Sequence, residues 1–242
     1  MSPREFGSGS PLLFLHGGWG YDIYPVDRQR PRLAKRARVI APDRIGYGRT
    51  PRPAAFEPDF HQRAATETSA LLDALGLERP VLWGHSDGAV IGALIGLAAP
   101  ERIGGLILEA MHMSGRKPSS RAFFETIAAD PDSVGPRVAA ILASDHGDDW
   151  REVIRRHSVA WLRLADERPA GWDFYGGRLG DLRVRTLIVH GADDPRTEPG
   201  ELEAIVAAIG AARALIIPGG GHSPHSERTA ADAVTDAVID FL

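Results

Sequence analysis

The stretch Pro80-Val81-Leu82-Trp83-Gly84-His85-Ser86-Asp87-Gly88-Ala89 decides the fold. Its apolar start is typical of a buried strand, and the Gly/Ala-rich segment from Asp87 to Ala98 is typical of a helix. Ser86 lies on the turn between them, where Gly84 and Gly88 allow the strand and the helix to approach closely. A serine in a tight turn is the simpler interpretation, but a strand before and a helix after are the context in which a GxSxG serine is a nucleophile.

The overall composition predicts a globular protein of one domain, with room for an inserted lobe. Its 242 residues are 43% hydrophobic and 25% charged, enough for one substantial core. The net charge of -4, with both signs interspersed, provides no basic surface for nucleic acid or membrane. No apolar stretch reaches ~18 residues, and residues 1–10 lack the apolar core of a signal peptide. We therefore expect a cytoplasmic protein without nucleic-acid or membrane partners.

The absence of cysteine restricts the chemistry. Disulfides, a thiolate nucleophile and cysteine-ligated metals are excluded, so covalent catalysis must use serine, aspartate, histidine or another oxygen or nitrogen group. The histidines also lack ligand spacing with carboxylates, so we expect neither a metal nor an organic cofactor.

Two glycine-containing loops follow short apolar runs near the N-terminus. Residues 11–15 are continuously apolar, as in a strand covered on both faces, and end at His16-Gly17-Gly18-Trp19-Gly20. Such a loop can direct an unpaired backbone N–H into a cavity, as an oxyanion hole requires, or it can be a connecting turn. A second strand is expected at residues 37–42, followed by residues 43–50, which contain two glycines separated by one residue. This pattern indicates a dinucleotide-binding motif only weakly, because the third glycine of that motif is missing and Pro51 prevents a helix from starting there.

The rest of the chain alternates between helix and strand patterns. A helical pattern at residues 61–75 is followed by the Ser86 strand, and another strand at residues 105–110 has Glu109 and His112 at its end. Later strands at 184–190 and 214–217 and helices at 198–209 and 228–242 complete the pattern. This alternation predicts a doubly wound α/β fold whose ligands bind at the carboxyl ends of the strands.

Between these strands lies a segment without any strand pattern. Residues 113–182 show helical patterns at 119–129, 134–143 and 148–165, which predicts a helical cap inserted into a core of residues 1–112 and 183–242. The segment is rich in aromatic residues, namely Phe123, Phe124, Trp150, Trp161, Trp172, Phe174 and Tyr175. We expect most of them to pack the cap and the rest to line an apolar pocket. Arginines and acidic residues are balanced here, so nothing indicates a strongly anionic substrate.

Asp194 and His222 follow the last two strands. His222 comes directly after three glycines, a setting that core packing explains poorly. One helix and one strand separate the two residues, and because such crossovers are right-handed the acid and the imidazole return to the same edge of the sheet. The order Ser86, Asp194, His222, with the serine on a strand–turn–helix, matches the α/β-hydrolase arrangement.

With these motifs in place, the chain resembles the α/β-hydrolase superfamily, in its group of capped serine esterases and carbon–carbon bond hydrolases. The resemblance rests on residues 16–20, 43–50, 84–88, 190–194 and 221–222 and implies a catalytic triad of Ser86, Asp194 and His222. It also implies an oxyanion hole formed by the backbone N–H groups of Asp87 and Gly18, with Trp19 as the alternative donor. Serine at the nucleophile position disfavours the dehalogenase and epoxide hydrolase branches, which use aspartate.

Two departures from the family pattern affect the expected fold. Members usually begin with an antiparallel hairpin, but only residues 1–10 are available for it, so we expect a mostly parallel sheet of about six strands with a reduced N-terminal edge and helices on both faces. An open edge could be covered by a partner subunit, so both a monomer and a homodimer are considered. Asp87 stands where an apolar residue is commoner, and we expect its carboxylate to point away into a hydrogen-bonded setting.

The function expected from these residues is acyl transfer to and from Ser86 on a small ester, lactone or similar carbonyl substrate. Carbon–carbon bond hydrolysis of a vinylogous diketone would use the same residues, and a non-catalytic ligand receptor on the same fold is the remaining alternative. Asp193 and Glu109 are the competing acids for the triad. Candidate substrate-binding residues are Trp19, Glu109, His112 and Trp161.

Overall fold

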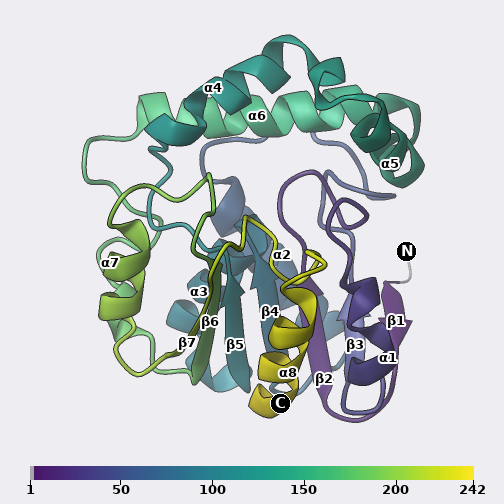
Figure 1. Ribbon diagram of the computed structural model, residues 1–242, viewed down its shortest axis with the longest axis vertical. Coiled ribbons are helices and arrows are strands. Elements are labelled where there is room, and N and C mark those ends of the chain that lie inside the picture. The colour runs from purple at the N-terminus through teal and green to yellow at the C-terminus, as the bar shows by residue number, and fades with distance from the viewer. Residues whose placement is uncertain (1–2) are drawn as a thin grey trace.

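A seven-stranded sheet forms the centre of the molecule (Figure 1). The computed structural model describes residues 3–242, so the first two residues of the N-terminal stretch considered above lie outside the described part. The strand order is β1-β3-β2-β4-β5-β6-β7, and only β1 pairs in the antiparallel direction. The strands are β1 (Arg4–Phe6), β2 (Pro11–Leu15), β3 (Arg38–Ala41), β4 (Val81–His85), β5 (Gly105–Glu109), β6 (Thr186–Gly191) and β7 (Arg213–Ile217).

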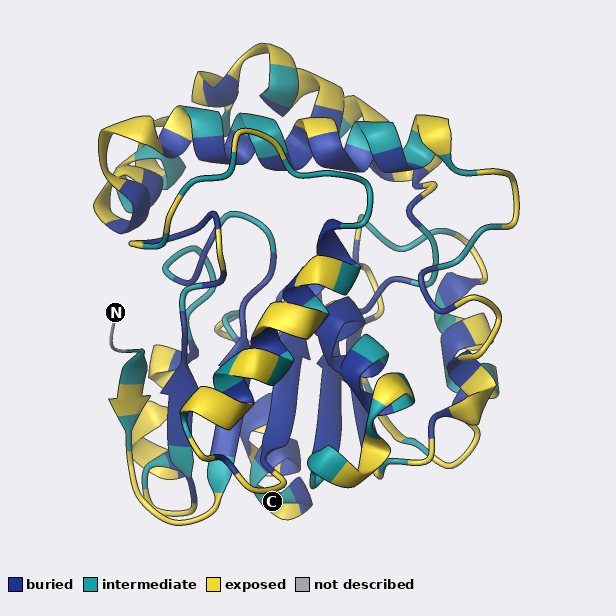
Figure 2. Cartoon of the chain, turned by 180° about the vertical axis from the view of Figure 1, so that it is seen from behind, coloured by how far each residue is buried: buried dark blue, intermediate teal, exposed yellow. Residues whose placement is uncertain are grey.

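Helices cover both faces of this sheet, which is why its strands are apolar at successive positions. In β2, Leu13 and Leu15 pack in a core cluster with α2 (Phe60–Ala74), α3 (Asp87–Ala98) and α7 (Glu201–Ala208). Leu12 and Phe14 point the opposite way, toward α1 (Arg30–Leu33) and α8 (Ala231–Phe241). Figure 2 shows the central strands buried along their length. Because both faces are buried, continuous apolarity rather than alternation marks these strands.

Three helices lie across the top of the sheet in Figure 1, beyond the carboxyl ends of the parallel strands. They are α4 (Pro118–Ala129), α5 (Pro136–His146) and α6 (Trp150–Glu167). They share a small apolar cluster around Ile127, Leu142, Trp150 and Ile154. Residues 113–182, all of which are described, contain no strand. We call this segment the cap. No helix within residues 3–242 is both long and apolar enough to span a lipid bilayer.

The short remaining turns are 3-10 helices η1 (Val26–Arg28), η2 (Pro100–Arg102), η3 (Pro131–Val134), η4 (Gly147–Asp149) and η5 (Leu179–Asp181). The expected α/β architecture is confirmed, and the predicted helix at 87–98 has the observed bounds. The sheet has seven strands instead of about six because Arg4–Phe6 pairs with β3. A three-residue strand with two charged residues carries no periodic pattern, so the sequence did not predict it.

Glycines 84 and 88 set the distance between β4, α3 and β2. A Cβ on Gly88 would lie 2.0 Å from the carbonyl oxygen of Leu15, a backbone atom that cannot move without shifting β2. Gly92 lies one turn later in α3, where a Cβ would meet Leu106 and Leu108 at ordinary distances of 3.6 and 3.7 Å. Both positions lie in α3, but only Gly88 leaves no room for a Cβ.

We predict that Gly88→Ala lowers the free energy of unfolding by more than about 3 kcal/mol, because the added methyl group overlaps the β2 backbone. Gly92→Ala is the matched control and should leave stability unchanged or raise it by about 0.5–1 kcal/mol through helix propensity. Urea denaturation of the two variants measures the difference. Equal stabilities would contradict the proposed close packing of α3 on β2.

Candidate active site

Ser86 occupies a strained turn between β4 and α3. Its φ of 54° and ψ of -118° lie in a region that residues other than glycine rarely adopt. The turn is tight because a Cβ on Gly84 would lie 2.1 Å from the carbonyl oxygen of Gly88. The N–H of Ser86 donates to the carbonyl of Glu109 at the end of β5, at 2.8 Å. The strain and the anchored backbone hold the Ser86 hydroxyl at the carboxyl edge of the sheet.

The structure brings Ser86, His222 and Asp194 together in one hydrogen-bonded row. His222 Nε2 lies 3.1 Å from Ser86 Oγ, and its Nδ1 lies 3.0 and 2.9 Å from the two carboxylate oxygens of Asp194. Burial acts to raise the pKa of Asp194, but the hydrogen bond and charge of His222 outweigh it and hold that pKa well below its ordinary value. Asp194 is therefore ionised and accepts the Nδ1 proton, so Nε2 is free to accept the serine proton.

A second imidazole also contacts Ser86. His112 Nε2 lies 3.3 Å from Ser86 Oγ, and its ring is nearly parallel to that of His222, with the centroids 5.8 Å apart. Burial, reinforced by the charge of Lys117, lowers the pKa of His112 well below its ordinary value, so this imidazole is neutral. Tyr175 Oη donates to the His112 carbonyl at 2.7 Å and fixes the loop after β5. Unlike His222, His112 has no acid on its Nδ1 among the described residues.

The carboxylate of Asp87 is buried and points away from Ser86, as expected. His61 Nε2 and His157 Nε2 approach its two oxygens at 3.0 and 2.9 Å, and Arg44 lies at 3.7 Å. Burial acts to raise the pKa of Asp87, but the two histidines outweigh it and lower that pKa well below its ordinary value. His157 belongs to α6, so this network also links the cap to α3. The Asp87 N–H is the first of α3 and has no carbonyl one turn earlier in the helix.

Glu109 does not reach the substrate side, which corrects the expectation that it contacts substrate. Its side chain is fully buried and accepts hydrogen bonds from Trp83 Nε1 and from the backbone N–H and Nδ1 of His225, each at 2.9 Å. His225 Nε2 donates to the carbonyl of Tyr24 at 2.9 Å, so both ring nitrogens donate and the ring is an imidazolium. Both side chains of the pair therefore lie in the protein interior, where Trp83 also holds Glu109 by a hydrogen bond.

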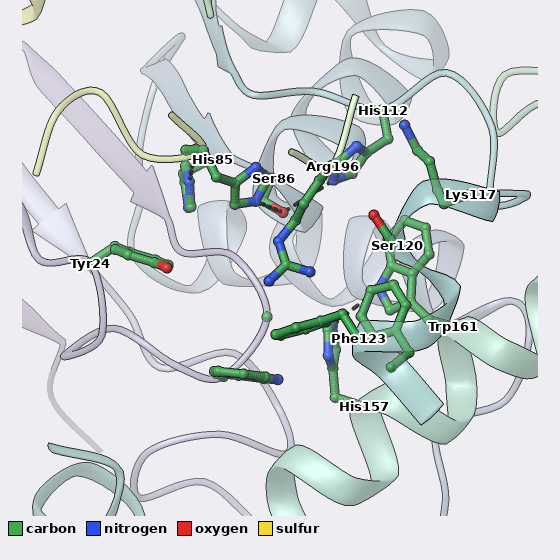
Figure 3. Close-up of a pocket in the computed structure, with 14 residues that line it drawn as sticks. Tyr24, His85, Ser86, His112, Lys117, Ser120, Phe123, His157, Trp161 and Arg196 are labelled. Atoms are coloured by element: carbon green, nitrogen blue, oxygen red, sulfur yellow. Dashed lines mark hydrogen bonds between the residues drawn. The ribbon is translucent and has the colours of Figure 1, made fainter. Parts of the chain in front are cut away.

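A cavity opens in front of Ser86, and side chains of α4 and α6 form part of its lining (Figure 3). It provides about 40 Å³ of free volume, room for only a few water molecules. Trp19, His112 and Trp161, which were expected to contact substrate, line it together with Gly18. The other lining residues are Tyr24, His85, Ser86, Lys117, Ser120, Phe123, Phe124, His157, Arg196 and His222. Within residues 3–242, no group of three or more His, Asp or Glu side chains is arranged to hold a metal ion.

The sequence analysis did not single out six of the lining residues, namely Tyr24, His85, Lys117, Ser120, His157 and Arg196. His85 Nε2 contacts the His222 carbonyl at 3.0 Å and Ser223 Oγ at 2.9 Å, so it supports the loop that carries His222. Burial lowers the pKa of His85 to about 3, which keeps it neutral. Its place inside the Gly84–Gly88 motif was an available signal. Arg196, two residues after Asp194, had a similar signal, whereas His157 lies on an amphipathic helix where nothing distinguishes it.

The buried Glu109–His225 pair generates a prediction about stability and pH. Burial lowers the pKa of His225, but Glu109 outweighs it, so the pKa rises above the ordinary 6.5. The resulting stabilisation is complete below pH about 6.5 and is lost as the pH rises through the folded-state pKa. The pKa of Glu109 falls from 4.5 to about 2, because His225 outweighs burial, so this contribution is present above pH about 4.5 and is lost toward pH 2.

We therefore predict that Glu109→Gln lowers the free energy of unfolding by about 3–5 kcal/mol near pH 5–6, because it leaves a buried imidazole without its counter-charge. The difference from wild type should shrink as the pH is raised through the elevated pKa of His225, above which the imidazole is neutral in both proteins. Urea denaturation across this pH range measures it. The exposed Glu203→Gln is the control, and a difference that grows with pH would refute the ion pair.

The chain matches known proteins along most of its length. The profile of the alpha/beta hydrolase family matches residues 12–237. The 2-hydroxy-6-oxo-2,4-heptadienoate hydrolase of Pseudomonas putida is 34% identical over 216 residues, which cover 79% of this chain and 74% of that protein. The 2-hydroxy-6-oxo-6-phenylhexa-2,4-dienoate hydrolase of Comamonas testosteroni is 27% identical over 264 residues, covering 99% and 90%.

Solved structures show the same fold. An esterase from Exiguobacterium antarcticum superposes with a TM-score of 0.77 at 20% identity, covering 98% of this chain and 93% of that one. The enol-lactonase from Burkholderia xenovorans LB400 has a TM-score of 0.74, also at 20% identity, with 98% and 94% covered. The family match over most of the sequence, with the relatives named as hydrolases, shows that this chain belongs to the alpha/beta hydrolase family.

Proposed function

We propose that the protein is a serine hydrolase in which Ser86 attacks the carbonyl group of a small substrate. The observation that carries this proposal is the row of contacts in which His222 joins the strained Ser86 to the ionised Asp194. A hydroxyl is a weak nucleophile until a base accepts its proton, and an acid that orients the base stabilises the cation that forms. The hydrolase names of the matched relatives favour an enzyme over a receptor.

Two imidazoles contact Ser86 Oγ, and only one is suited to be the base. Protonation of His222 is stabilised by the Asp194 carboxylate on its other nitrogen. His112 is buried beside the Lys117 cation without such an acid, so a proton on it is strongly disfavoured. His112 instead acts as a donor, with Nε2–H directed at Ser86 Oγ while the serine hydroxyl donates to His222. In this arrangement His112 steadies the hydroxyl and stabilises negative charge that develops on it.

The reaction then runs in two halves. Ser86 Oγ bonds to the substrate carbonyl carbon as its proton moves to His222 Nε2, and the carbonyl electrons move to the oxygen. The oxyanion is stabilised by the N–H of Asp87 and that of Gly18, with Trp19 as the alternative. When the tetrahedral intermediate collapses, His222 returns the proton to the leaving group. Water repeats these steps on the acyl-enzyme, releasing the acid and restoring Ser86.

The loop that supplies the second N–H is held by the cap. Trp19 has a left-handed φ of 73°, and its carbonyl lies 2.7 Å from Nε2 of His146 in α5. The N–H of Gly48 donates to Nδ1 of the same ring at 2.9 Å, so Nε2 carries the proton and donates to Trp19. The Trp19 ring stacks on Phe123 of α4, with centroids 5.4 Å apart. We propose that residues 113–182 act as a cap that fixes this loop and selects the substrate through its aromatic side chains.

Carbon–carbon bond hydrolysis is the second candidate, favoured by the names of the Pseudomonas and Comamonas relatives. Both reactions would use Ser86, His222 and Asp194. A panel of p-nitrophenyl esters, lactones and vinylogous 1,5-diketones distinguishes them by the ratio of kcat/KM. Preferred cleavage of the diketones would replace the ester hydrolase proposal with the carbon–carbon one.

Substitutions in the row of contacts test the assignment of Asp194. We predict that Ser86→Ala lowers kcat on a p-nitrophenyl ester by on the order of 10⁶-fold and Asp194→Asn by on the order of 10⁴-fold. Asp193→Asn is the matched control, because Asp193 is adjacent but exposed, and it should keep the wild-type rate. A larger loss from Asp193→Asn than from Asp194→Asn would show that the acid is misassigned.

Substitutions of His222 and His112, the two histidines that contact Ser86, should lower kcat to different extents in the same assay. His222→Ala should lower kcat by on the order of 10⁶-fold, because the base is lost. We expect His112→Ala to lower kcat by about tenfold, the contribution of one hydrogen bond to the nucleophile. Initial rates at saturating substrate measure both. Equal losses would mean that His112 shares the role of base.

A further inference from the structure

The cavity contains one cation without a counter-charge, the guanidinium of Arg196. This residue lies on the loop after β6, and its backbone N–H donates to Asp194 Oδ1 at 2.9 Å, which ties it to the catalytic acid. Its guanidinium carbon lies 3.8 Å from the centroid of the Phe123 ring. Figure 3 shows the side chain extending into the space between Ser86 and Phe123. The side chain thus points to the reacting centre.

The other charged groups around the cavity are already compensated. Lys117 forms an ion pair with Glu201, and the carboxylate of Asp194 is bound to His222. No carboxylate among the described residues lies within the 4.0 Å ion-pair distance of Arg196. The lining of the cavity contains no aspartate or glutamate. The carboxylates of Asp194 and Asp87 act on Arg196 only at longer range, so its guanidinium faces the space in front of Ser86 without a direct counter-ion.

An arginine in this position is costly without a ligand. Burial lowers the pKa of Arg196, but a guanidinium stays protonated at any physiological pH, so it cannot become neutral as a buried lysine or histidine can. A partly buried cation is unfavourable unless it is paired. The Phe123 face compensates only part of this cost and holds the guanidinium plane in one orientation. Its fork of N–H groups then remains available for a planar anion.

We propose that Arg196 forms an anion subsite and binds a carboxylate of the substrate, so that the preferred substrates are small carbonyl compounds that carry a second, ionised carboxylate group. This inference rests on the proposed serine hydrolase function and names its substrate class. A carboxylate matches the planar guanidinium in two parallel hydrogen bonds. The balanced charges of the cap gave no sign of it because Arg196 belongs to the core.

The test compares two esters of equal acyl length, p-nitrophenyl hemiglutarate, which is anionic, and p-nitrophenyl pentanoate, which is neutral. We expect the wild type to prefer the hemiglutarate by about tenfold or more in kcat/KM, the contribution of a charge-assisted hydrogen-bond pair. Arg196→Gln should remove that preference, and Arg196→Lys should keep part of it. The exposed Arg137→Gln is the matched control and should leave the ratio unchanged.

The ratio of the two rates cancels any general loss of activity in a variant. A wild-type ratio near one, or a ratio that is the same in Arg196→Gln, would overturn the subsite while leaving the serine hydrolase proposal intact. If neither ester is cleaved, the hydrolase proposal fails, and calorimetric titration with glutarate tests the subsite by itself. Glutarate binding that weakens about tenfold or more in Arg196→Gln supports the subsite. Equal binding by both proteins, or none by wild type, overturns it.

Discussion

The close approach of β4 and α3 is the constraint on which the rest of the site depends. Gly84 and Gly88 leave no room for a Cβ, so the turn closes tightly and Ser86 is forced into a positive φ. Its hydroxyl is thereby fixed at the edge of the sheet, and His222 and Asp194 arrive there from the ends of later strands. The strain is stabilised by the apolar residues packed around β4 and α3 and by the Ser86–Glu109 backbone hydrogen bond.

Around this turn, position in the fold decides the charge of each histidine. His225 faces Glu109 and is an imidazolium that fastens the loop after β7. His85 and His112 are buried without an acid on Nδ1 and are neutral, so one supports the loop of His222 and the other the hydroxyl of Ser86. Only His222 combines an ionised acid with a contact to Ser86, and this combination makes it the base in our proposal.

The architecture and the row of Ser86, His222 and Asp194 could be predicted from the sequence because strand patterns, glycine turns and right-handed crossovers are local or topological rules. Glu109 was misplaced as a substrate contact because its direction depends on Trp83 and His225, which lie 26 and 116 residues away along the chain. Strand β1 was not predicted because its three residues are too few to show a periodic pattern. Arg196 lies two residues after Asp194, which is a signal in the sequence, but its access to the cavity depends on how Phe123 of α4 packs against it, and no local pattern encodes that packing.

The proposed mechanism requires a covalent acyl intermediate at Ser86. Rapid quenching of the enzyme with excess p-nitrophenyl ester, followed by intact and peptide mass spectrometry, detects it directly. We predict one acyl group per chain, located on Ser86, that forms before steady state and disappears as the ester is exhausted. Continued turnover with an unmodified Ser86, or with the acyl group on another residue, would contradict the account.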